Sequence, residues 1–144
     1  MKYSEVKEKK ELDILKNQKA NYKNLKFQFT ENFLKKLKSK LNAKNSIQII
    51  VKKEEDFVGY IAGFEKLRFL WVSELFVSEK YQKKKVGSKL LNRVIKKSKE
   101  NKLKGIIAQT EFENIPAQKL YLKNGFTKIK NPLWKDGITF KKNL

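Results

Sequence analysis

The apolar residues of this chain recur with two periods, and their order along the sequence predicts a mixed α+β fold. Strand-like runs occupy residues 46–53, 57–65 and 69–77, and the short polar segment between the first two predicts a hairpin. Residues 87–99 carry apolar side chains at helical spacing, which predicts an amphipathic helix. Residues 105–110 then read as a short buried strand. The order predicts an antiparallel meander followed by one parallel crossover around the helix.

The N-terminal region, residues 1–45, is predicted to be helical. Residues 6–22 are highly charged, and their few apolar anchors favour a helix: Leu12, Ile14 and Leu15. A second helix is predicted to begin after Thr30, whose hydroxyl can cap it. Its apolar positions recur at helical spacing: Phe33, Leu34, Leu37 and Leu41.

The C-terminal region is predicted to add one more helix and a hairpin. Pro116 suits the first turn of a helix, and Gly125 suits the position after its C-terminus. Residues 126–129 and 138–141 then predict a closing hairpin around residues 134–137. No linker or internal repeat interrupts the chain, so we expect residues 1–144 to form a single domain.

Composition excludes several kinds of chemistry. With 144 residues and 40% apolar content, the chain can bury one core. It contains no cysteine and no histidine, which excludes disulfides and a thiol nucleophile and argues strongly against a zinc site. We therefore expect no metal. No apolar run is long enough to span a membrane and no signal peptide is evident, so we expect a soluble cytoplasmic protein.

The formal charge of +20 raises the question of a nucleic-acid partner. Only Arg68 and Arg93 among the 35 basic residues are arginines, although arginine is the usual reader of phosphates and bases. The lysines are spread along the whole chain rather than gathered in one block. We interpret the charge as mostly compositional, with a field that still attracts anionic ligands.

Two local motifs carry the functional prediction. The segment LFVSEKYQKKKVGSKLL, residues 75–91, is a strand, a polar loop and a helix, an arrangement that presents backbone N–H groups to a pyrophosphate. The segment NIPAQKLYLKNGF, residues 114–126, places a tyrosine on a short helix that ends in Gly-Phe. Together they resemble the cofactor-binding motifs of the GNAT superfamily of acetyl-CoA-dependent N-acetyltransferases. The resemblance covers roughly residues 57–140 and is weak before residue 46.

The resemblance implies a fold and a cofactor site. It implies a GNAT-like, mostly antiparallel sheet flanked by helices, in which strand 69–77 is splayed from its parallel neighbour 105–110 and acetyl-CoA lies in the gap. The family usually opens with a β-strand, for which residues 1–6 are a poor candidate. The residues that match or flank the family's cofactor-contacting positions are Leu75, Phe76, Val77, Gln82, Lys83, Lys84, Lys85, Val86, Gly87, Ser88, Asn114, Ala117, Tyr121 and Lys123.

One residue departs from the family's loop pattern. Lys85 stands where the family usually has its first glycine. A right-handed helical conformation would tolerate the lysine, and its ammonium could then contact a phosphate. A positive φ would instead weaken cofactor binding. We expect the tolerated, right-handed conformation.

The resemblance also implies direct transfer of the acetyl group to an amine in a ternary complex. Tyr121 is the candidate general acid for the leaving thiolate, its alternative being a packing role. Glu74 interrupts an apolar strand and is the candidate base; alternatively it binds the amine electrostatically. Glu111 and Glu113 are weaker candidate bases. Asn114 could bind the cofactor's pantetheine arm, cap a helix, or do both.

The acceptor is less well determined. Residues 108–126 are similar to the same region in small bacterial GNAT enzymes that act on antibiotics and in protein N-terminal acetyltransferases. Because a +20 protein repels polycations unless local carboxylates reverse the sign, a small or weakly charged amine or a peptide N-terminus is favoured. Trp71, Trp134, Phe64 and Phe69 could line its pocket.

Two other functions remain open from the sequence. One is a basic nucleic-acid-binding module, which would leave residues 114–126 unexplained. The other is a GNAT-like domain that binds acetyl-CoA without catalysis. Dimers are common in the superfamily, so a homodimer through the C-terminal hairpin also stays open.

Overall fold

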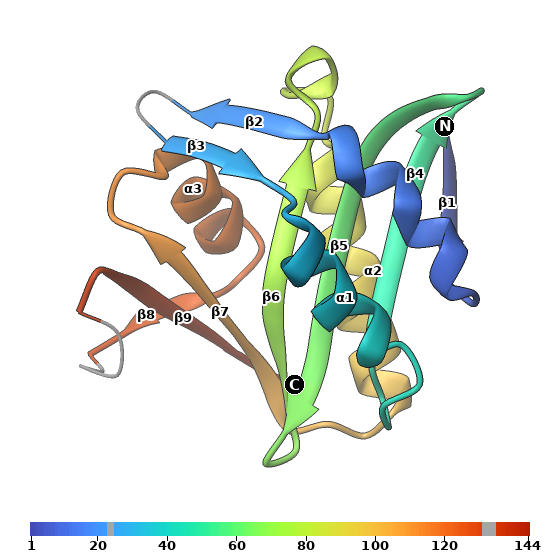
Figure 1. The fold of residues 1–144 in the computed structure, drawn as a ribbon. Helices are drawn as coiled ribbons and strands as arrows, with labels where there is room; N and C mark the ends of the chain where they lie inside the picture. The colour runs from blue at the N-terminus through green and yellow to red at the C-terminus, as the bar shows by residue number, and fades with distance from the viewer. Residues whose placement is uncertain (23–24, 131–134) are drawn as a thin grey trace.

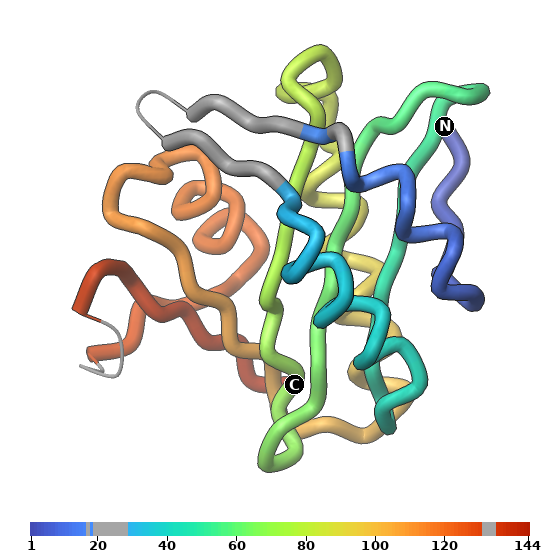
Figure 2. Tube along the Cα trace, in the orientation of Figure 1, coloured from blue at the N-terminus to red at the C-terminus, as the bar shows by residue number. Residues whose placement is uncertain are grey.

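The computed structural model of the chain describes residues 1–22, 25–130 and 135–144, together with their side chains except at residues 17, 19–22 and 25–28 (Figure 2). Within these residues no helix has both the length and the apolar character needed to cross a bilayer. The elements, in chain order, are strand β1 (Lys2–Glu5), 3-10 helix η1 (Lys9–Asn17), strands β2 (Lys19–Tyr22) and β3 (Leu25–Gln28), helix α1 (Glu31–Ser39), strands β4 (Ile47–Lys53), β5 (Asp56–Lys66) and β6 (Phe69–Val77), 3-10 helix η2 (Glu79–Tyr81), helix α2 (Val86–Glu100), strand β7 (Gly105–Glu111), helix α3 (Ile115–Lys123), and strands β8 (Thr127–Ile129) and β9 (Gly137–Asn143).

A seven-stranded sheet organises the molecule, in the order β1-β4-β5-β6-β7-β9-β8. All its neighbouring strands are antiparallel except β6 and β7, which are parallel. Helix α2 makes the crossover between these two strands and covers one face of the sheet, while η1 and α1 cover the other (Figure 1). The mixed, mostly antiparallel α+β fold predicted from the sequence is confirmed.

The parallel pair is splayed. Strands β6 and β7 pair only from Phe69 opposite Gly105 to Val72 opposite Ala108. Beyond this point β6 continues to Val77 and β7 to Glu111, and the two strands diverge (Figure 1). Within the described residues, the edge of β6 that faces β7 has no strand partner after Val72. The gap therefore opens where the resemblance implied it.

Two apolar clusters fill the two faces of the sheet. One packs the buried side of α2 against β4–β7 and includes Leu90, Leu91 and Val94, all fully buried. The other packs η1 and α1 against the opposite face. Helix α1 begins as predicted, because the Thr30 hydroxyl accepts a hydrogen bond of 3.2 Å from the backbone N–H of Phe33.

The N-terminal region differs from its helical prediction. Residues 2–5 form edge strand β1, which pairs antiparallel with β4. This strand is short and polar, and it is held by backbone hydrogen bonds that a hydrophobic pattern does not reveal. Leu12 and Leu15 are buried, as predicted. The helix that carries them is a 3-10 helix, in which residues three apart lie on the same face. A second, two-stranded sheet of β2 and β3 then follows.

The other predicted elements are confirmed. Strands β4 to β7 and helices α2 and α3 lie at the expected positions within one or two residues at most ends. Strands β8 and β9 pair antiparallel, as the predicted C-terminal hairpin requires. The part of its turn at residues 131–134, including Trp134, lies outside the described residues.

Candidate active site

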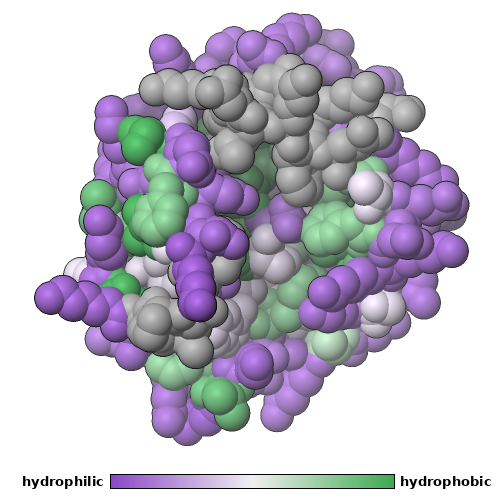
Figure 3. All heavy atoms as spheres, turned by 60° about the vertical axis from the view of Figure 1, so that its left-hand side comes forward, coloured by the Kyte–Doolittle hydropathy of each residue, from purple (hydrophilic) through white to green (hydrophobic). Residues whose placement is uncertain are grey.

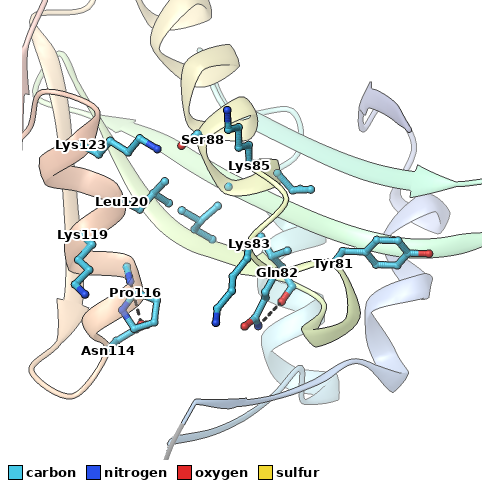
Figure 4. Close-up of a pocket in the computed structure, with 15 residues that line it drawn as sticks. Tyr81, Gln82, Lys83, Lys85, Ser88, Asn114, Pro116, Lys119, Leu120 and Lys123 are labelled. Atoms are coloured by element: carbon cyan, nitrogen blue, oxygen red, sulfur yellow. Dashed lines mark hydrogen bonds between the residues drawn. The ribbon is translucent and has the colours of Figure 1, made fainter.

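A pocket of about 450 Å³ lies where β6 ends, between the N-terminus of α2 and the length of α3 (Figure 4). Strand β6 supplies its floor, the η2–α2 loop and the first turn of α2 one wall, and α3 the facing wall. The residues that line it are Leu75, Val77, Tyr81, Gln82, Lys83, Lys85, Val86, Gly87, Ser88, Asn114, Pro116, Ala117, Lys119, Leu120 and Lys123.

Side-chain hydrogen bonds to β5 and β6 hold the loop between η2 and α2. The Gln82 side-chain amide donates a 3.1 Å hydrogen bond to the carbonyl of Val77, at the end of β6 (Figure 4). The Tyr81 hydroxyl donates a 2.6 Å hydrogen bond to the Asp56 carboxylate, and Lys80 Nζ lies 3.4 Å from the same oxygen. Both bonds hold the pKa of the Asp56 carboxyl below its ordinary value. The start of β5 thus anchors the loop that enters α2.

Lys85 adopts the left-handed conformation, with φ 64° and ψ 15°, immediately before α2. The prediction of a right-handed conformation at this position is therefore wrong. Lys83 also has a φ of 64°. Side chains with a Cβ reach such angles only at a cost of about 1–2 kcal/mol per residue.

The first turn of α2 faces the pocket with its backbone. The opening N–H groups of a helix have no partner within it, and Val86, Gly87 and Ser88 of this turn line the pocket. Gly87 lets α2 and α3 lie close together at this point, because a Cβ there would be only 3.1 Å from Leu120 Cδ2 on α3. The turn therefore offers backbone donors, with the positive end of the helix dipole, to an anion.

Helix α3 is positioned by its own cap and by a link to α2. The Asn114 side-chain oxygen accepts a 3.2 Å hydrogen bond from the backbone N–H of Ala117, so Asn114 is a helix N-cap that also lines the pocket. At the other end, the Asn124 amide donates hydrogen bonds to the Leu120 carbonyl at 2.8 Å and to Ser88 Oγ at 3.4 Å. These contacts fix the spacing of the two pocket walls.

The pocket suits a long anionic ligand with an apolar stretch. Lysines stand on both walls: Lys83 and Lys85 on the loop, Lys119 and Lys123 on α3 (Figure 4). Leu75, Val77 and Leu120 give its interior an apolar lining. Phosphates would find lysines and helix N–H groups at the rim, and a flexible arm would follow the apolar floor toward the splay.

Glu74 lies on the face of the sheet opposite this pocket. A bulge displaces the register between β5 and β6, so that Gly63 faces Val72 whereas Ala62 faces Glu74. Val72 belongs to the cluster under α2, and Phe76 to the cluster under α1. Because side chains alternate along a strand, Glu74 shares the α1 face with Phe76. Burial of this half-buried carboxyl, and then the charge of Glu111, raise the pKa of Glu74 to about 8.

Tyr121 lies on α3 at the splay. Its side chain is 3% exposed and packs between Phe126 and Phe140, with both ring centroids at 5.4 Å. Burial, then the negative charges of Glu74 and of Glu111, raise the pKa of the Tyr121 phenol above its ordinary value. The phenol is therefore protonated throughout the neutral range and lies within electrostatic reach of both carboxylates.

Most of the predicted cofactor residues line the pocket, and three do not. Phe76 is buried in the cluster under α1, Tyr121 is buried in the cluster under α2, and the Lys84 ammonium lies 5.6 Å from the centre of the Tyr81 ring. The pocket also contains four residues that the motifs did not single out. These residues are Tyr81, Pro116, Lys119 and Leu120. They lie inside the two motifs, and Leu120 could have been found from its place beside Tyr121.

Of the aromatics proposed for an acceptor pocket, three are described. Phe64 and Trp71 are half-buried and face each other across β5 and β6. Lys40 Nζ lies 4.8 Å from the Phe64 ring centre, and Lys141 Nζ lies 5.0 Å from that of Phe69. Among the described residues, no group of three or more carboxylates could hold a metal ion.

The family follows from comparison with known proteins. The Acetyltransferase (GNAT) family model matches residues 13–126 of the chain. Because this match covers well over half of the chain, the protein belongs to the GNAT acetyltransferase family, whose cofactor is acetyl-CoA. A comparison with curated proteins finds no match.

Solved structures agree with this assignment. A GNAT-family acetyltransferase of Staphylococcus aureus Mu50 is 25% identical, with a TM-score of 0.79 over 99% of this chain and 98% of that one. A candidate streptothricin acetyltransferase of Bacillus anthracis, in complex with acetyl coenzyme A, is 23% identical with a TM-score of 0.67, over 75% of this chain and 68% of that one. The ribosomal-protein-S18-alanine N-acetyltransferase of Escherichia coli is 14% identical with a TM-score of 0.77, over 99% and 92%. The last two likenesses concern the fold alone.

Proposed function

We propose that the protein transfers the acetyl group of acetyl-CoA directly to a primary amine of a small molecule or a peptide N-terminus, within a ternary complex. The observation that carries this proposal is the splay between β6 and β7. It has a lysine-rimmed pocket on the side of α2 and α3 and a half-buried carboxyl, Glu74, on the side of α1. The two substrates would enter from opposite faces and meet in the gap.

Glu74 is the proposed base. An amine must lose a proton before it can attack, and the nitrogen is a cation at neutral pH. A carboxyl with a pKa of about 8 takes that proton more readily than an ordinary glutamate. Glu74 also follows the last residue of β6 paired with β7 by only two positions. It therefore stands at the mouth of the splay, within reach of a nitrogen that approaches the thioester.

Tyr121 is the proposed acid. As the C–N bond forms and the C–S bond breaks, its hydroxyl would give its proton to the departing sulfur. The nitrogen, which has already given one proton to Glu74, loses its second proton to the tyrosine oxygen, directly or through water. Tyr121 is thereby restored, and Glu74 releases its proton to solvent. This scheme uses no covalent intermediate, as suits a chain without cysteine or histidine.

Strand β6 would align the thioester. Beyond Val72 its edge toward β7 has no strand partner in the described part of the chain. Backbone N–H groups along residues 75–77 are therefore the proposed donors to the pantetheine arm and to the thioester carbonyl, whose oxygen gains charge during attack. Alignment of the thioester with the amine supplies the remaining part of the rate enhancement.

Two measurements test the proposed function. Calorimetric titration with acetyl-CoA at moderate salt should show saturable one-to-one binding. A thiol-release assay with a panel of amines should then show release that depends on both substrates, with acetylamide as product. Binding without thiol release from any amine would indicate a non-catalytic acetyl-CoA-binding domain. Absence of binding, with salt-sensitive binding of RNA or DNA instead, would favour the nucleic-acid alternative.

A further inference from the structure

Three apolar side chains beside the gap lie outside the core. Phe69 and Trp71 of β6 and Ile107 of β7 are each half-buried. Within the described residues, they belong to neither of the two apolar clusters that fill the sheet. Neighbouring apolar side chains outside a core mark ligand or partner sites in many proteins. We call Phe69, Trp71 and Ile107 the platform.

The platform residues lie on the same side of the sheet as α1. The residues next to them in sequence belong to the cluster under α2: Leu70, Val72, Ile106 and Ala108. Because side chains alternate along a strand, the platform residues lie on the opposite side. Trp71 pairs directly with Ile107, one position before the pairing of β6 with β7 ends. The platform therefore ends where the gap begins.

The two rings of the platform are held in place by the sheet. Phe69 lies opposite Gly105, and a Cβ at Gly105 would be only 2.8 Å from Phe69 Cε1. The absence of a side chain at Gly105 therefore leaves the room that the Phe69 ring occupies. The Trp71 indole N–H donates a 3.3 Å hydrogen bond to the Lys66 carbonyl on β5. Both rings thus present a defined surface on the side of α1.

Two lysines place positive charge over the platform. Lys141 Nζ lies 5.0 Å from the centre of the Phe69 ring, and Lys66 Nζ lies 6.0 Å from the centre of the Trp71 ring. Both distances are within the cation–π range of about 6 Å. Glu65, the residue before Lys66, lies on the other side of the sheet by alternation, because Phe64 packs against the cluster under α1. An anionic group that reaches these rings would meet both ammonium groups.

The charge on the side of α1 changes sign along β6. The register shift between β5 and β6 places Glu74 on this side at the gap, and alternation from Ala108 places Glu111 of β7 on it as well. At a rise of about 3.3 Å per residue, Trp71 is roughly 10 Å from Glu74 along the strand. A molecule that lies along β6 would therefore meet negative charge at the gap and positive charge at the platform.

From this arrangement we propose that the platform binds the acceptor, which is an amine with an apolar, planar body and an anionic group at its far end. The amine nitrogen reaches Glu74, the body lies on Trp71 and Ile107, and the anionic group binds at Lys66 and Lys141. The inference rests on the proposed function and assigns an acceptor-binding surface to it.

The shape and charge of the molecule agree with such an acceptor. Seen from the side of α3 and β7, the molecule is hollowed, with hydrophobic side chains at the border of the hollow (Figure 3). An acceptor that carries one positive and one negative group has little net charge, so the field of a chain with a formal charge of +20 does not repel it. Its two ends instead match the two charges along β6.

The first test compares two matched acceptors. 4-(2-Aminoethyl)benzoate and 4-methylphenethylamine have the same amine and the same ring, and they differ in a carboxylate against a methyl group. We expect kcat/KM to be about tenfold or more higher for the carboxylate, because it forms charge-assisted contacts with the lysines.

Two double variants test the lysines. In Lys66→Met/Lys141→Met the ratio of the two kcat/KM values should fall to near one, because methionine keeps an unbranched apolar side chain and removes the charge. Lys52→Met/Lys53→Met removes the same charge at the exposed end of β4 and should keep the ratio of the wild type.

Trp71 provides a measurement that needs no turnover. The chain has two tryptophans, Trp71 and Trp134, so Trp134→Phe leaves Trp71 as the single indole. With coenzyme A in place of acetyl-CoA, titration with 4-(2-aminoethyl)benzoate should change the Trp71 emission in a saturable way. 4-Methylphenethylamine should require an about tenfold higher concentration for the same change.

Three outcomes would overturn the inference. They are equal kcat/KM for the two acceptors, a preference for the carboxylate that survives Lys66→Met/Lys141→Met, and a Trp71 emission that does not respond to either amine. All three leave the transferase function intact. Saturable binding at Trp71 without acetylation of any amine would instead refute the proposed function and retain the platform as a binding site.

Discussion

The two sides of the splay present different ionisable groups. On the side of α2 and α3, the pocket is rimmed by Lys83, Lys85, Lys119 and Lys123 around a helix N-terminus. On the side of α1, Glu74 and Glu111 have no cationic partner among the described residues. In the proposed function, the anionic donor and the amine acceptor would approach one gap between strands from these two sides. The difference shows that a net charge of +20 says little about the charge at either side of a site.

Removal of the acceptor-side carboxylate should have the largest effect. Glu74→Gln is expected to lower kcat/KM by a factor of about 10²–10⁴ and to remove the acidic limb of the pH profile, which the wild type should show near the Glu74 pKa of about 8. Acetyl-CoA affinity should be nearly unchanged, because the cofactor pocket lies on the other face. An unchanged pH profile in the variant would contradict the assignment of Glu74 as the base.

The same substitution should increase stability at high pH. Glu74 binds its proton more tightly in the folded state, where its pKa is about 8, than in the unfolded chain, where it is about 4.5. The free energy of unfolding of the wild type should therefore fall as the pH rises from about 4.5 to 8. Glutamine does not titrate, so Glu74→Gln should gain relative stability between pH 5 and pH 9. Urea unfolding at both pH values measures this change, and an equal difference at both would refute it.

Tyr121→Phe tests the residue between the two sides. Because phenylalanine keeps the packing against Phe126 and Phe140, the variant should fold and bind acetyl-CoA within about twofold of the wild type. Loss of the proton donor should lower kcat by about 10–10²-fold. Single-turnover kinetics would separate this effect from product release. A kcat equal to that of the wild type would assign Tyr121 a packing role alone.

On the donor side, Asp56 is expected to act through Tyr81. The hydrogen bond of 2.6 Å from the Tyr81 hydroxyl to Asp56 anchors the loop before α2, so Asp56→Asn should weaken acetyl-CoA binding about three- to tenfold with little change in kcat. Tyr81→Phe should have a similar effect, and the double variant little more than either alone. Additive losses would show that the two residues act separately.

The donor side could be predicted from the sequence because its parts are local. Residues 75–91 and 114–126 each contain a strand end or turn with the helix that follows it, and eleven predicted residues line the pocket: Leu75, Val77, Gln82, Lys83, Lys85, Val86, Gly87, Ser88, Asn114, Ala117 and Lys123. Glu74 was also visible, as a charge within an apolar strand. Its role and that of Tyr121 remain predictions.

The parts that could not be predicted depend on distant contacts. The placement of Glu74 on the α1 face follows from a register shift of β5 against β6 between Ala62 and Gly63, and the gap beside it from the divergence of β6 and β7. Strand β1 is stabilised by pairing with β4, about 45 residues away in the chain. The hydrophobic pattern along the sequence reveals neither the register shift and strand divergence nor the pairing of β1 with β4. The left-handed conformation of Lys85 could not be predicted for a different reason, because conformational propensity alone favours the right-handed region for lysine.

Lys85→Gly should have the smallest effect. It relieves the strain of a positive φ and at the same time removes a positive charge from the pocket, and these two changes oppose each other in acetyl-CoA binding. Glycine removes the cost of the φ of 64°, which should raise the melting temperature by a few degrees; it also removes an ammonium from the pocket rim. Lys85→Ala removes the ammonium but keeps the backbone cost. We therefore expect acetyl-CoA to bind Lys85→Gly about two- to fivefold more tightly than Lys85→Ala, by calorimetry at matched salt. If the two variants bind equally, the left-handed conformation does not limit the donor side, and the lysine acts through its charge alone.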